Sequence, residues 1–185
     1  MEAPFLTGEQ IYLRPLDEDD VDRCLRWIND AEVARGVGRK GPISRTQERE
    51  WIVGQYKSRS TFSLAIVLKA GDRHIGNCGL HEIEPENGRA EFGILIGEKG
   101  EWGKGYGPEA AGMLLRYGFE ELRLHRIDLE VYAQNERAQR AYEKAGFVLE
   151  GRRRESYFSQ GAFDDTLIMG ILKPEWEKHA GTVLE

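Results

Sequence analysis

The sequence predicts an α+β fold with a mixed central sheet of about seven strands flanked by about four helices. Two observations support this prediction. In the first half, turns separate consecutive stretches rich in aliphatic and β-branched residues, which indicates an antiparallel meander. The second half begins with the most strongly amphipathic helical stretch of the chain, and a strand, a helix and a closing strand pair follow it. We therefore expect a single domain over residues 10–176, with residues 1–9 and 177–185 as flanking tails.

The N-terminal part is expected to contain the first strand and two helices. Residues 10–16 alternate between apolar and polar side chains, which predicts a strand. The acidic run Asp17–Asp20 opens a helix, because carboxylates are favoured at the positive end of a helix dipole. Residues 35–42 hold three glycines and predict a loop. Ser44 and Gln47 then have the capping-box spacing that begins a second helix, through about residue 57.

The remaining elements follow from hydrophobic periodicity and turn residues. They are strands at 61–69, 74–83, 89–97, 126–131, 147–158 and 163–172, and helices at 108–122 and 136–145. Asn135 is a suitable N-cap for the last helix, and Gly146 is a suitable residue just after its end.

Composition and charge exclude several classes of protein. The chain has 185 residues, of which 40% are hydrophobic and 31% charged, and this is typical of a globular domain. A net charge of −6 argues against an extended nucleic-acid surface. The apolar run at residues 64–68 is too short to cross a membrane, and no secretory signal is visible. Two cysteines, Cys24 and Cys78, cannot build a disulfide framework or a zinc cluster, so we expect a cytoplasmic protein without a metal.

Residues 101–108, Glu-Trp-Gly-Lys-Gly-Tyr-Gly-Pro, lie between a predicted strand and the amphipathic helix. Gly103, Gly105 and Gly107 permit backbone conformations that let several amides converge on one anion. Pro108 suits the first turn of the helix, whose dipole adds about half a positive charge at that end. The segment therefore predicts a phosphate site. It is neither a P-loop nor a dinucleotide fingerprint, because Gly-Lys-Ser/Thr is absent and the glycine spacing is GxGxG.

Two further features lie near this segment. Gly93 stands inside the preceding strand, which indicates a bulge or a close approach of another group to the backbone. Asn135, Ala138 and Tyr142 have the spacing i, i+3, i+7 and share one face of their helix.

Together these motifs resemble the GNAT superfamily of acetyl-CoA-dependent N-acetyltransferases over about residues 10–176, and most of all its branch of ribosomal-protein N-terminal acetyltransferases and related diamine acetyltransferases. The resemblance is carried by Trp27–Asp30 with Glu32 and Val33, by residues 102–110 and by residues 135–151. It implies the GNAT fold and the transfer of an acetyl group from acetyl-CoA to a primary amine.

The resemblance also implies site residues. The cofactor-binding residues are Ile94, Leu95, Ile96, Trp102, Gly103, Lys104, Gly105, Tyr106, Gly107, Asn135 and Ala138. Backbone amides of the glycine segment would hold the CoA pyrophosphate, and the strand at residues 94–96 would pair with the pantetheine arm. Trp102 stands where the family commonly has Gln or Arg. Tyr142 matches the tyrosine that protonates the departing thiolate, although a core aromatic is the alternative reading.

Two residues are candidates for the general base: Glu91 on the strand at residues 89–97, and His81 on the neighbouring strand at residues 74–83. For both, a purely structural role stays open. A backbone N–H near Ile94 is the expected oxyanion donor. Deprotonating an amine of pKa near 10.4 at pH 7 costs roughly 4 to 5 kcal/mol, against about 1 kcal/mol for an α-amine of pKa near 8. The expected acceptor is therefore a peptide or protein N-terminal α-amine.

Other interpretations remain open at this stage. The acceptor is alternatively a polyamine or another small amine such as an antibiotic, or the chain is a non-catalytic acyl-CoA-binding regulatory module. The loop at residues 35–43 and the turn at residues 159–165 are expected to line the acceptor side. The basic run Arg152–Arg154 is interpreted as a solvated strand end. The protein is expected to be a monomer or a homodimer.

Overall fold

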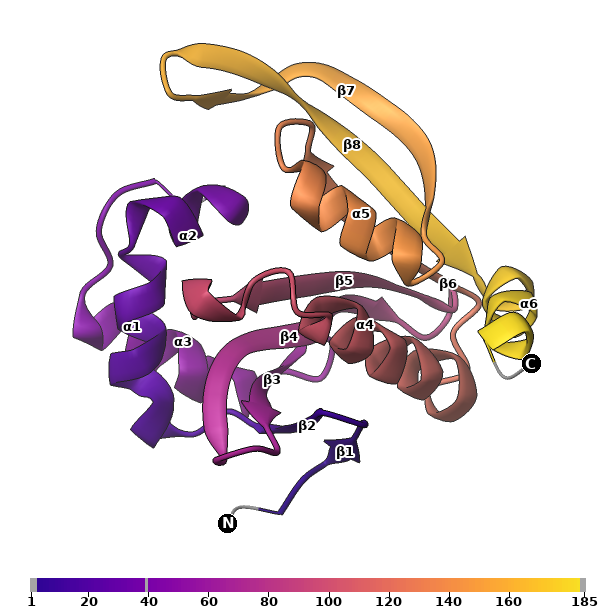
Figure 1. Cartoon of the computed structure of the whole chain (residues 1–185), viewed down its shortest axis with the longest axis horizontal. Coiled ribbons are helices and arrows are strands. Elements are labelled where there is room, and N and C mark those ends of the chain that lie inside the picture. Colours follow the sequence, from indigo (N-terminus) through magenta and orange to yellow (C-terminus); the bar gives the residue numbers. More distant parts are fainter. Residues whose placement is uncertain (1–2, 39, 184–185) are drawn as a thin grey trace.

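A single eight-stranded sheet, in the order β1-β2-β3-β4-β5-β6-β8-β7, forms the centre of the computed structural model (Figure 1). The structure describes residues 3–38 and 40–183. Arg39 of the predicted loop, and residues 1, 2, 184 and 185 of the predicted tails, lie outside the described residues. The strands are β1 (Leu6–Thr7), β2 (Ile11–Pro15), β3 (Phe62–Leu68), β4 (Arg73–Glu84), β5 (Arg89–Ile96), β6 (Arg126–Tyr132), β7 (Val148–Ser159) and β8 (Ala162–Leu172). The helices are α1 (Val21–Ile28), α2 (Ala31–Gly36), α3 (Arg45–Gln55), α4 (Tyr106–Arg116), α5 (Glu136–Lys144) and α6 (Lys173–Val183).

The α+β class and the mixed sheet are confirmed, but three short or terminal elements were not predicted. β1 has two residues, too few for an alternation pattern. Helix α2 lies mostly before the predicted loop and includes only its first two residues, 35 and 36. Asp30 caps this helix by accepting from the amides of Glu32 (2.9 Å) and Val33 (3.2 Å). Helix α6 runs on beyond Trp176, into the stretch expected to be a tail.

The sheet divides where β5 meets β6. Strands β2 to β5 form the expected antiparallel meander. Strands β5 and β6 are parallel, and their register covers only Arg89–Glu91 opposite Arg126–Asp128. Both strands continue past this point, β5 to Ile96 and β6 to Tyr132, so they diverge and leave an opening in the sheet. Because this opening exposes the backbone edge of β5, it becomes the location of the candidate site.

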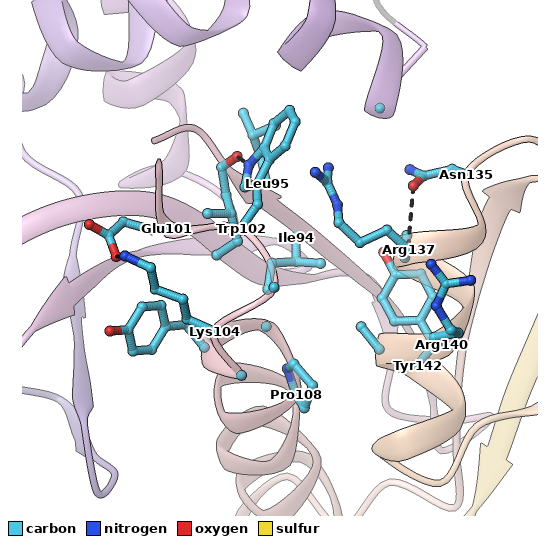
Figure 2. A pocket seen from close by; sticks show the side chains of 18 of the residues that line it. Ile94, Leu95, Glu101, Trp102, Lys104, Pro108, Asn135, Arg137, Arg140 and Tyr142 are labelled. Carbon is cyan, nitrogen blue, oxygen red and sulfur yellow. Dashed lines mark hydrogen bonds and ion pairs between the residues drawn. The ribbon is translucent and has the colours of Figure 1, made fainter. Parts of the chain in front are cut away.

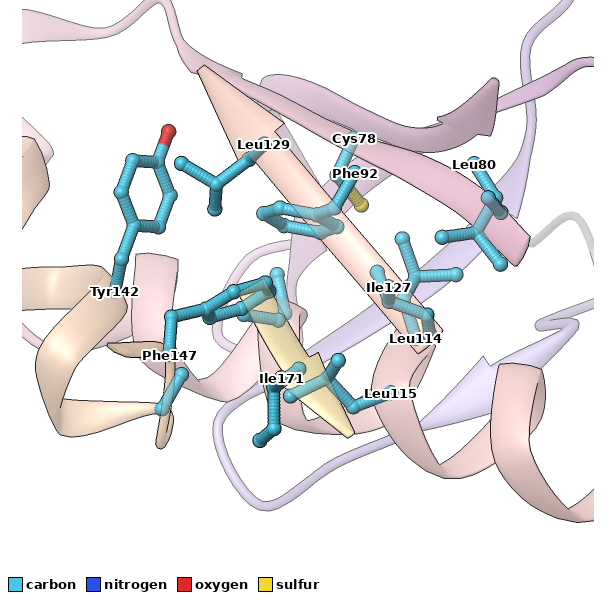
Figure 3. Close-up of a cluster of buried hydrophobic side chains, with 14 of the residues drawn as sticks. Cys78, Leu80, Phe92, Leu114, Leu115, Ile127, Leu129, Tyr142, Phe147 and Ile171 are labelled. Carbon is cyan, nitrogen blue, oxygen red and sulfur yellow. The ribbon is translucent and has the colours of Figure 1, made fainter. Parts of the chain in front are cut away.

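Two hydrophobic clusters cover the two faces of the sheet. The larger cluster contains Phe92, Leu114 and Ile127, and it packs α4 against β4, β5 and β6 (Figure 3). The smaller cluster contains Val21, Trp27 and Ile52 and packs α1 and α3 on the other face. Side chains of β5 alternate between them, because Ile94 and Ile96 contact the first cluster and Leu95 contacts the second.

A buried polar cluster fixes the start of α1 to the sheet. The carboxylate of Asp20 accepts from two nitrogens of Arg14, at 2.7 and 2.8 Å, and lies 3.0 Å from Nδ1 of His74 on β4. Burial raises the pKa of Asp20, but the hydrogen bonds from Arg14 and His74 outweigh it and hold this pKa well below its usual range. The cluster therefore anchors the helix layer that carries one wall of the site.

Strands β7 and β8 form a long hairpin that projects beyond the rest of the sheet (Figure 1). A two-residue turn, Gln160-Gly161, joins them with φ angles of 52° and 84°, the left-handed conformation that suits a tight hairpin. Strand β7 lies at the edge of the sheet. The run Arg152–Arg154 on it is exposed, as expected, but it lies inside the strand and not at a strand end.

Candidate active site

The glycine segment begins helix α4 with two residues in the left-handed region. Gly103 has φ 77° and Gly105, the N-cap of α4, has φ 91°. The helix begins at Tyr106, two residues before the predicted start, and its N-terminus faces the opening in the sheet. The amides of Tyr106 and Gly107 lie in the first turn, where no helical carbonyl can accept from them. They therefore remain available to an anion, as the sequence predicts.

A cleft of about 580 Å³ lies between this segment and helix α5 (Figure 2). Its lining contains every cofactor-binding residue that the sequence predicts, together with Tyr142. These residues come from the end of β5, the glycine segment and α5 with its N-cap. Val33, Gly36 and Val37 add a wall from α2 and the residue after it. The structure thus brings the predicted cofactor residues together, while their roles stay predictions.

The backbone edge of β5 faces this cleft. The carbonyl of Ile96 accepts a hydrogen bond of 2.7 Å from Nε1 of Trp102 instead of pairing with another strand on that edge. Alternate residues of a strand direct their backbone groups to the same edge, so the N–H and C=O of Ile94 point in the same direction. An extended ligand arm in the cleft can therefore pair with Ile94 as an additional strand would.

Asn135 and Tyr142 occupy the facing wall on α5. The side-chain oxygen of Asn135 accepts from the amide of Ala138 at 3.2 Å, so Asn135 is the N-cap, as expected. Tyr142 is 9% exposed and packs edge-on against Phe92 and Phe147, with ring centroids 6.2 and 6.0 Å away. Burial raises the pKa of Tyr142 to about 12. Its hydroxyl is therefore protonated at neutral pH and can donate a hydrogen bond or a proton.

Basic side chains on the cleft were missed by the sequence analysis. Arg137, Arg140 and Lys144 line it from α5. Their spacing of i, i+3, i+7 places them on one helix face, and this periodicity is a signal that could have found them. From the other wall, Nζ of Lys104 donates to Glu101 at 2.8 Å. The cleft is thus locally basic in an acidic protein, which suits an anionic ligand.

A second cavity, of about 430 Å³, meets the first at Val37, Ile94 and Leu95. Its walls come from α1, α3, β3, β4 and β5, and most of them have no motif in the sequence. The lining side chains include Cys24, Ile28, Ile43, Gln47, Glu48, Trp51, Ser63, Asn77, Cys78 and His81. Because this cavity adjoins the open edge of β5, a group bound in it reaches the same backbone as a ligand in the cleft.

The two candidate bases differ in position. His81 and Glu91 stand opposite each other in the register of β4 and β5, but only His81 lines a cavity. A Cβ built on Gly93 would lie 3.0 Å from Nε2 of His81, so the imidazole packs directly over this glycine. The close approach expected at Gly93 is therefore made by His81.

The protonation of both groups is perturbed by burial. Burial lowers the pKa of His81, against a smaller opposing effect of Glu82, so its imidazole is neutral at pH 7 and can accept a proton. Burial raises the pKa of Glu91, and the neighbouring carboxylates of Glu82, Glu130 and Asp128 raise it further. A neutral imidazole on the cavity wall is the better placed of the two bases.

The two segments expected to line the acceptor side, the loop at residues 35–43 and the turn at residues 159–165, lie in different places. From the predicted loop, Val37 and Ile43 line the second cavity. The turn contributes no residue to that cavity; Ser159 and Gln160 instead face Lys40 and Gly41 across a separate groove. The hairpin turn is held there because Lys40 lies over the rings of Tyr157 and Phe158, at 5.2 and 5.7 Å.

Nucleophilic and metal chemistry find little support in the part of the chain that the structure describes. Cys24 and Cys78 are buried free thiols, and burial raises the pKa of Cys24 to about 12 and that of Cys78 further. Residues 3–38 and 40–183 contain no group of three histidine, cysteine or carboxylate side chains arranged to hold a metal ion. No described helix combines the length and the apolar character that crossing a membrane requires.

Comparison with known proteins yields a consistent result. Residues 10–148 match the family model described as an acetyltransferase (GNAT) domain. The chain is 31% identical over 176 residues to the uncharacterized N-acetyltransferase p20 of Bacillus licheniformis, covering 92% of this chain and 97% of that protein. It is 31% identical over 177 residues to the putative ribosomal N-acetyltransferase YdaF of Bacillus subtilis, covering 92% and 95%.

A solved structure agrees with the fold. The spermidine N-acetyltransferase from Vibrio cholerae, in complex with CoA and spermine, superimposes with a TM-score of 0.84 at 27% sequence identity. The superposition covers 91% of this chain and 98% of that chain.

Proposed function

Because the chain belongs to the GNAT acetyltransferase family, we propose that its cleft binds acetyl-CoA and that the acetyl group passes to the α-amine of a peptide or protein N-terminus bound in the second cavity. The observation that carries this proposal is the junction of the two cavities at Ile94 and Leu95. One cavity has a helix N-terminus for phosphate and the other has a neutral imidazole for an amine proton. Two substrates that bind in this way meet at one backbone edge.

The anionic part of the cosubstrate is held by the α4 side of the cleft. Amides of Tyr106 and Gly107 donate to the diphosphate, and the helix dipole stabilises its charge. The uncovered edge of β5 pairs with the amides of the pantetheine arm through the C=O of Ile94, because Trp102 already occupies the carbonyl of Ile96. This geometry directs the thioester toward the second cavity.

The transfer needs three proton or hydrogen-bond partners. The imidazole of His81 takes the proton from the attacking amine, directly or through a water. The N–H of Ile94 donates to the oxyanion of the tetrahedral intermediate. The hydroxyl of Tyr142 protonates the departing thiolate, so free CoA and an N-acetylated amine are released without a covalent enzyme intermediate.

The acceptor class follows from the strength of the base. Burial lowers the pKa of His81, so His81 is a weak base. An α-ammonium of pKa near 8 gives up its proton at roughly 3 kcal/mol less cost than an ammonium of pKa near 10.4. The described lining of the second cavity also holds a single carboxylate, that of Glu48, so the cavity presents little negative charge to a polycation.

A polyamine is the second candidate acceptor, because a solved relative is complexed with spermine. A polyamine carries several charges and requires several carboxylates, which the described lining of the cavity does not offer. The α-amine therefore remains the first choice. The cytoplasmic location and the monomeric or dimeric state stay predictions.

The test is the release of free CoA thiol from acetyl-CoA with a panel of amines. The panel contains short peptides with a free N-terminus, the same peptides with a blocked N-terminus and one lysine, spermidine, and an aminoglycoside. We expect the highest kcat/KM on free N-termini. A higher kcat/KM on spermidine would establish the second candidate instead, and acetyl-CoA binding without turnover on any amine would support a regulatory module.

A further inference from the structure

A pair of side chains, one from each wall of the cleft, stacks across the opening. The guanidinium of Arg137, from α5, lies over the indole ring of Trp102, from the glycine segment, at 3.5 Å from the ring centroid (Figure 2). Both side chains line the cleft. A cation stacked on an indole in this way is an attractive contact, so it joins the walls across the space that a ligand would occupy.

The two partners differ in how firmly they are held. Trp102 is partly buried, packs against the cluster of α1 and α3, and donates from Nε1 to the carbonyl of Ile96 at 2.7 Å. Arg137 is the second residue of α5, and its long, exposed side chain reaches across the opening. The indole is therefore the fixed partner, and only the rotamers of Arg137 must change to open the contact.

The position of the contact relates to the predicted path of the ligand. Trp102 immediately precedes the amides that would hold a diphosphate, and its indole is bonded to the end of β5, where the arm would run toward Ile94. An arm that follows this path passes beside the ring on which Arg137 lies. The contact is thus placed over the middle of the ligand rather than at either end.

We infer that Arg137 and Trp102 form a strap that closes over the pantetheine arm of the bound cosubstrate and slows its dissociation. This inference rests on the proposed function, since it presumes that the cleft binds CoA. The strap holds the arm against the β5 edge, and it adds to the positive charge of Arg137 a positioning role through its contact with Trp102. Because only one exposed side chain moves, opening does not limit the rate of entry.

The experiment measures CoA dissociation by stopped-flow tryptophan fluorescence in the full chain, with equilibrium affinities from calorimetry. The variants are Arg137→Gln, Trp102→Leu and the double variant. Arg116→Gln on α4 is the matched control, because it removes one positive charge from an exposed position outside the cleft lining. Each ligand series is repeated with adenosine 3′,5′-bisphosphate, which has no pantetheine arm.

We expect each single variant to release CoA about fivefold faster, as the loss of one cation–π contact predicts, and the double variant to release it no faster than either single variant. The affinity for adenosine 3′,5′-bisphosphate and the behaviour of Arg116→Gln should equal those of the wild type. Three results would each overturn the strap. They are a double variant whose rate of CoA release equals the product of the two single effects, a rate of CoA release that none of the variants changes, and an affinity for adenosine 3′,5′-bisphosphate that falls as much as the affinity for CoA.

The failure of the strap and the failure of the proposed function give different results. If the wild type does not bind CoA, both the proposed function and the strap are wrong. If the wild type binds CoA and acetylates amines while the variants behave like the wild type, only the strap is wrong. Thermal unfolding of each variant without ligand checks that Trp102→Leu retains the fold.

Discussion

The two cavities beside β5 are built in different ways. The cleft is built largely from backbone: amides at the start of α4 and the uncovered edge of β5 form its binding surface. The second cavity is built from side chains, which come one to three at a time from α1, α3 and three strands. A surface of backbone groups requires glycines and a capped helix at adjacent positions, and this leaves a local signature in the sequence. A surface of scattered side chains leaves none.

This difference means that the cleft depends little on side-chain identity, whereas the second cavity depends on it strongly. Backbone amides recognise phosphate whatever the neighbouring side chains are, so the cleft suits one cosubstrate. The second cavity changes its shape and charge with single substitutions at positions such as Ile43, Glu48 or Trp51. Under the proposed function, the acceptor is therefore selected by the part of the site that has the weakest sequence signal.

The largest expected effect tests the base in the second cavity. His81→Gln should lower kcat/KM for the amine about a hundredfold, because removal of a positioned base typically costs at least this much. In the wild type, kcat/KM should fall as the pH falls through the pKa of His81, which burial places below its usual value near 6.5. The acid limb of the pH–rate profile should be absent in the variant.

The control for His81 is its cross-strand neighbour. Glu91→Gln should leave both the rate and the acid limb close to those of the wild type, because Glu91 lines neither cavity. If Glu91→Gln removes the limb and His81→Gln does not, the assignment of the base is wrong.

An intermediate effect tests Tyr142 on the α5 wall of the cleft. Tyr142→Phe should lower kcat about twentyfold, less than the loss of the base, because a thiolate of pKa near 8.5 already leaves readily. The affinity for CoA, measured by calorimetry, should change less than twofold, since the isosteric ring keeps its packing against Phe92 and Phe147. An equal loss in CoA affinity would show that Tyr142 positions the cosubstrate instead of donating a proton.

The smallest effects come from a pair of glycine variants that should act on opposite sides of β5. Gly105→Ala forces an L-residue to φ 91° and should weaken CoA binding about fivefold, with an unchanged KM for the amine. Gly93→Ala places a methyl group 3.0 Å from Nε2 of His81 and should lower kcat/KM for the amine about fivefold, with unchanged CoA affinity.

The control for both glycine variants is Gly112→Ala in α4, where nothing lies within 4 Å of the added methyl group. It should bind CoA and turn over as the wild type does. If Gly93→Ala and Gly105→Ala change the same measured quantity, the assignment of CoA to the cleft and of the amine to the second cavity is wrong.

The extent of the sequence prediction follows the same division. The boundaries of the meander strands and of α5 agree within about two residues, because periodicity and capping residues such as Asn135 and Gly146 are local signals. The helix predicted over residues 108–122 begins two residues earlier as α4, which ends at Arg116, and it continues to Glu121 as a π-helical turn. Every predicted cofactor residue lines one cleft for the same reason. The stacking of Arg137 on Trp102 had no such signal, since it depends on how closely α5 approaches the glycine segment.

The acceptor side could not be predicted, because side-chain packing between distant elements builds it. Val37 and Ile43 were expected to line it, but Glu48 and Trp51 were read only as part of a helix after a capping box. Their entry into the cavity depends on the rotation of α3 about its axis, which tertiary packing sets. The turn at residues 159–165 lies outside the second cavity, and the sequence could not show this because the reach of the β7–β8 hairpin is not a local property.

The position of β7 at the end of the sheet has a consequence outside catalysis. An edge strand presents backbone N–H and C=O groups to which a strand of another molecule can add, and repeated addition leads to aggregates. Here the run Arg152–Arg154 lies along that edge, and the ion pairs of Arg152 with Asp165 and of Arg153 with Glu130 hold two of its charges in place. A second copy of β7 would bring its own arginines against these. The basic run thus protects an otherwise open edge from self-association by strand addition.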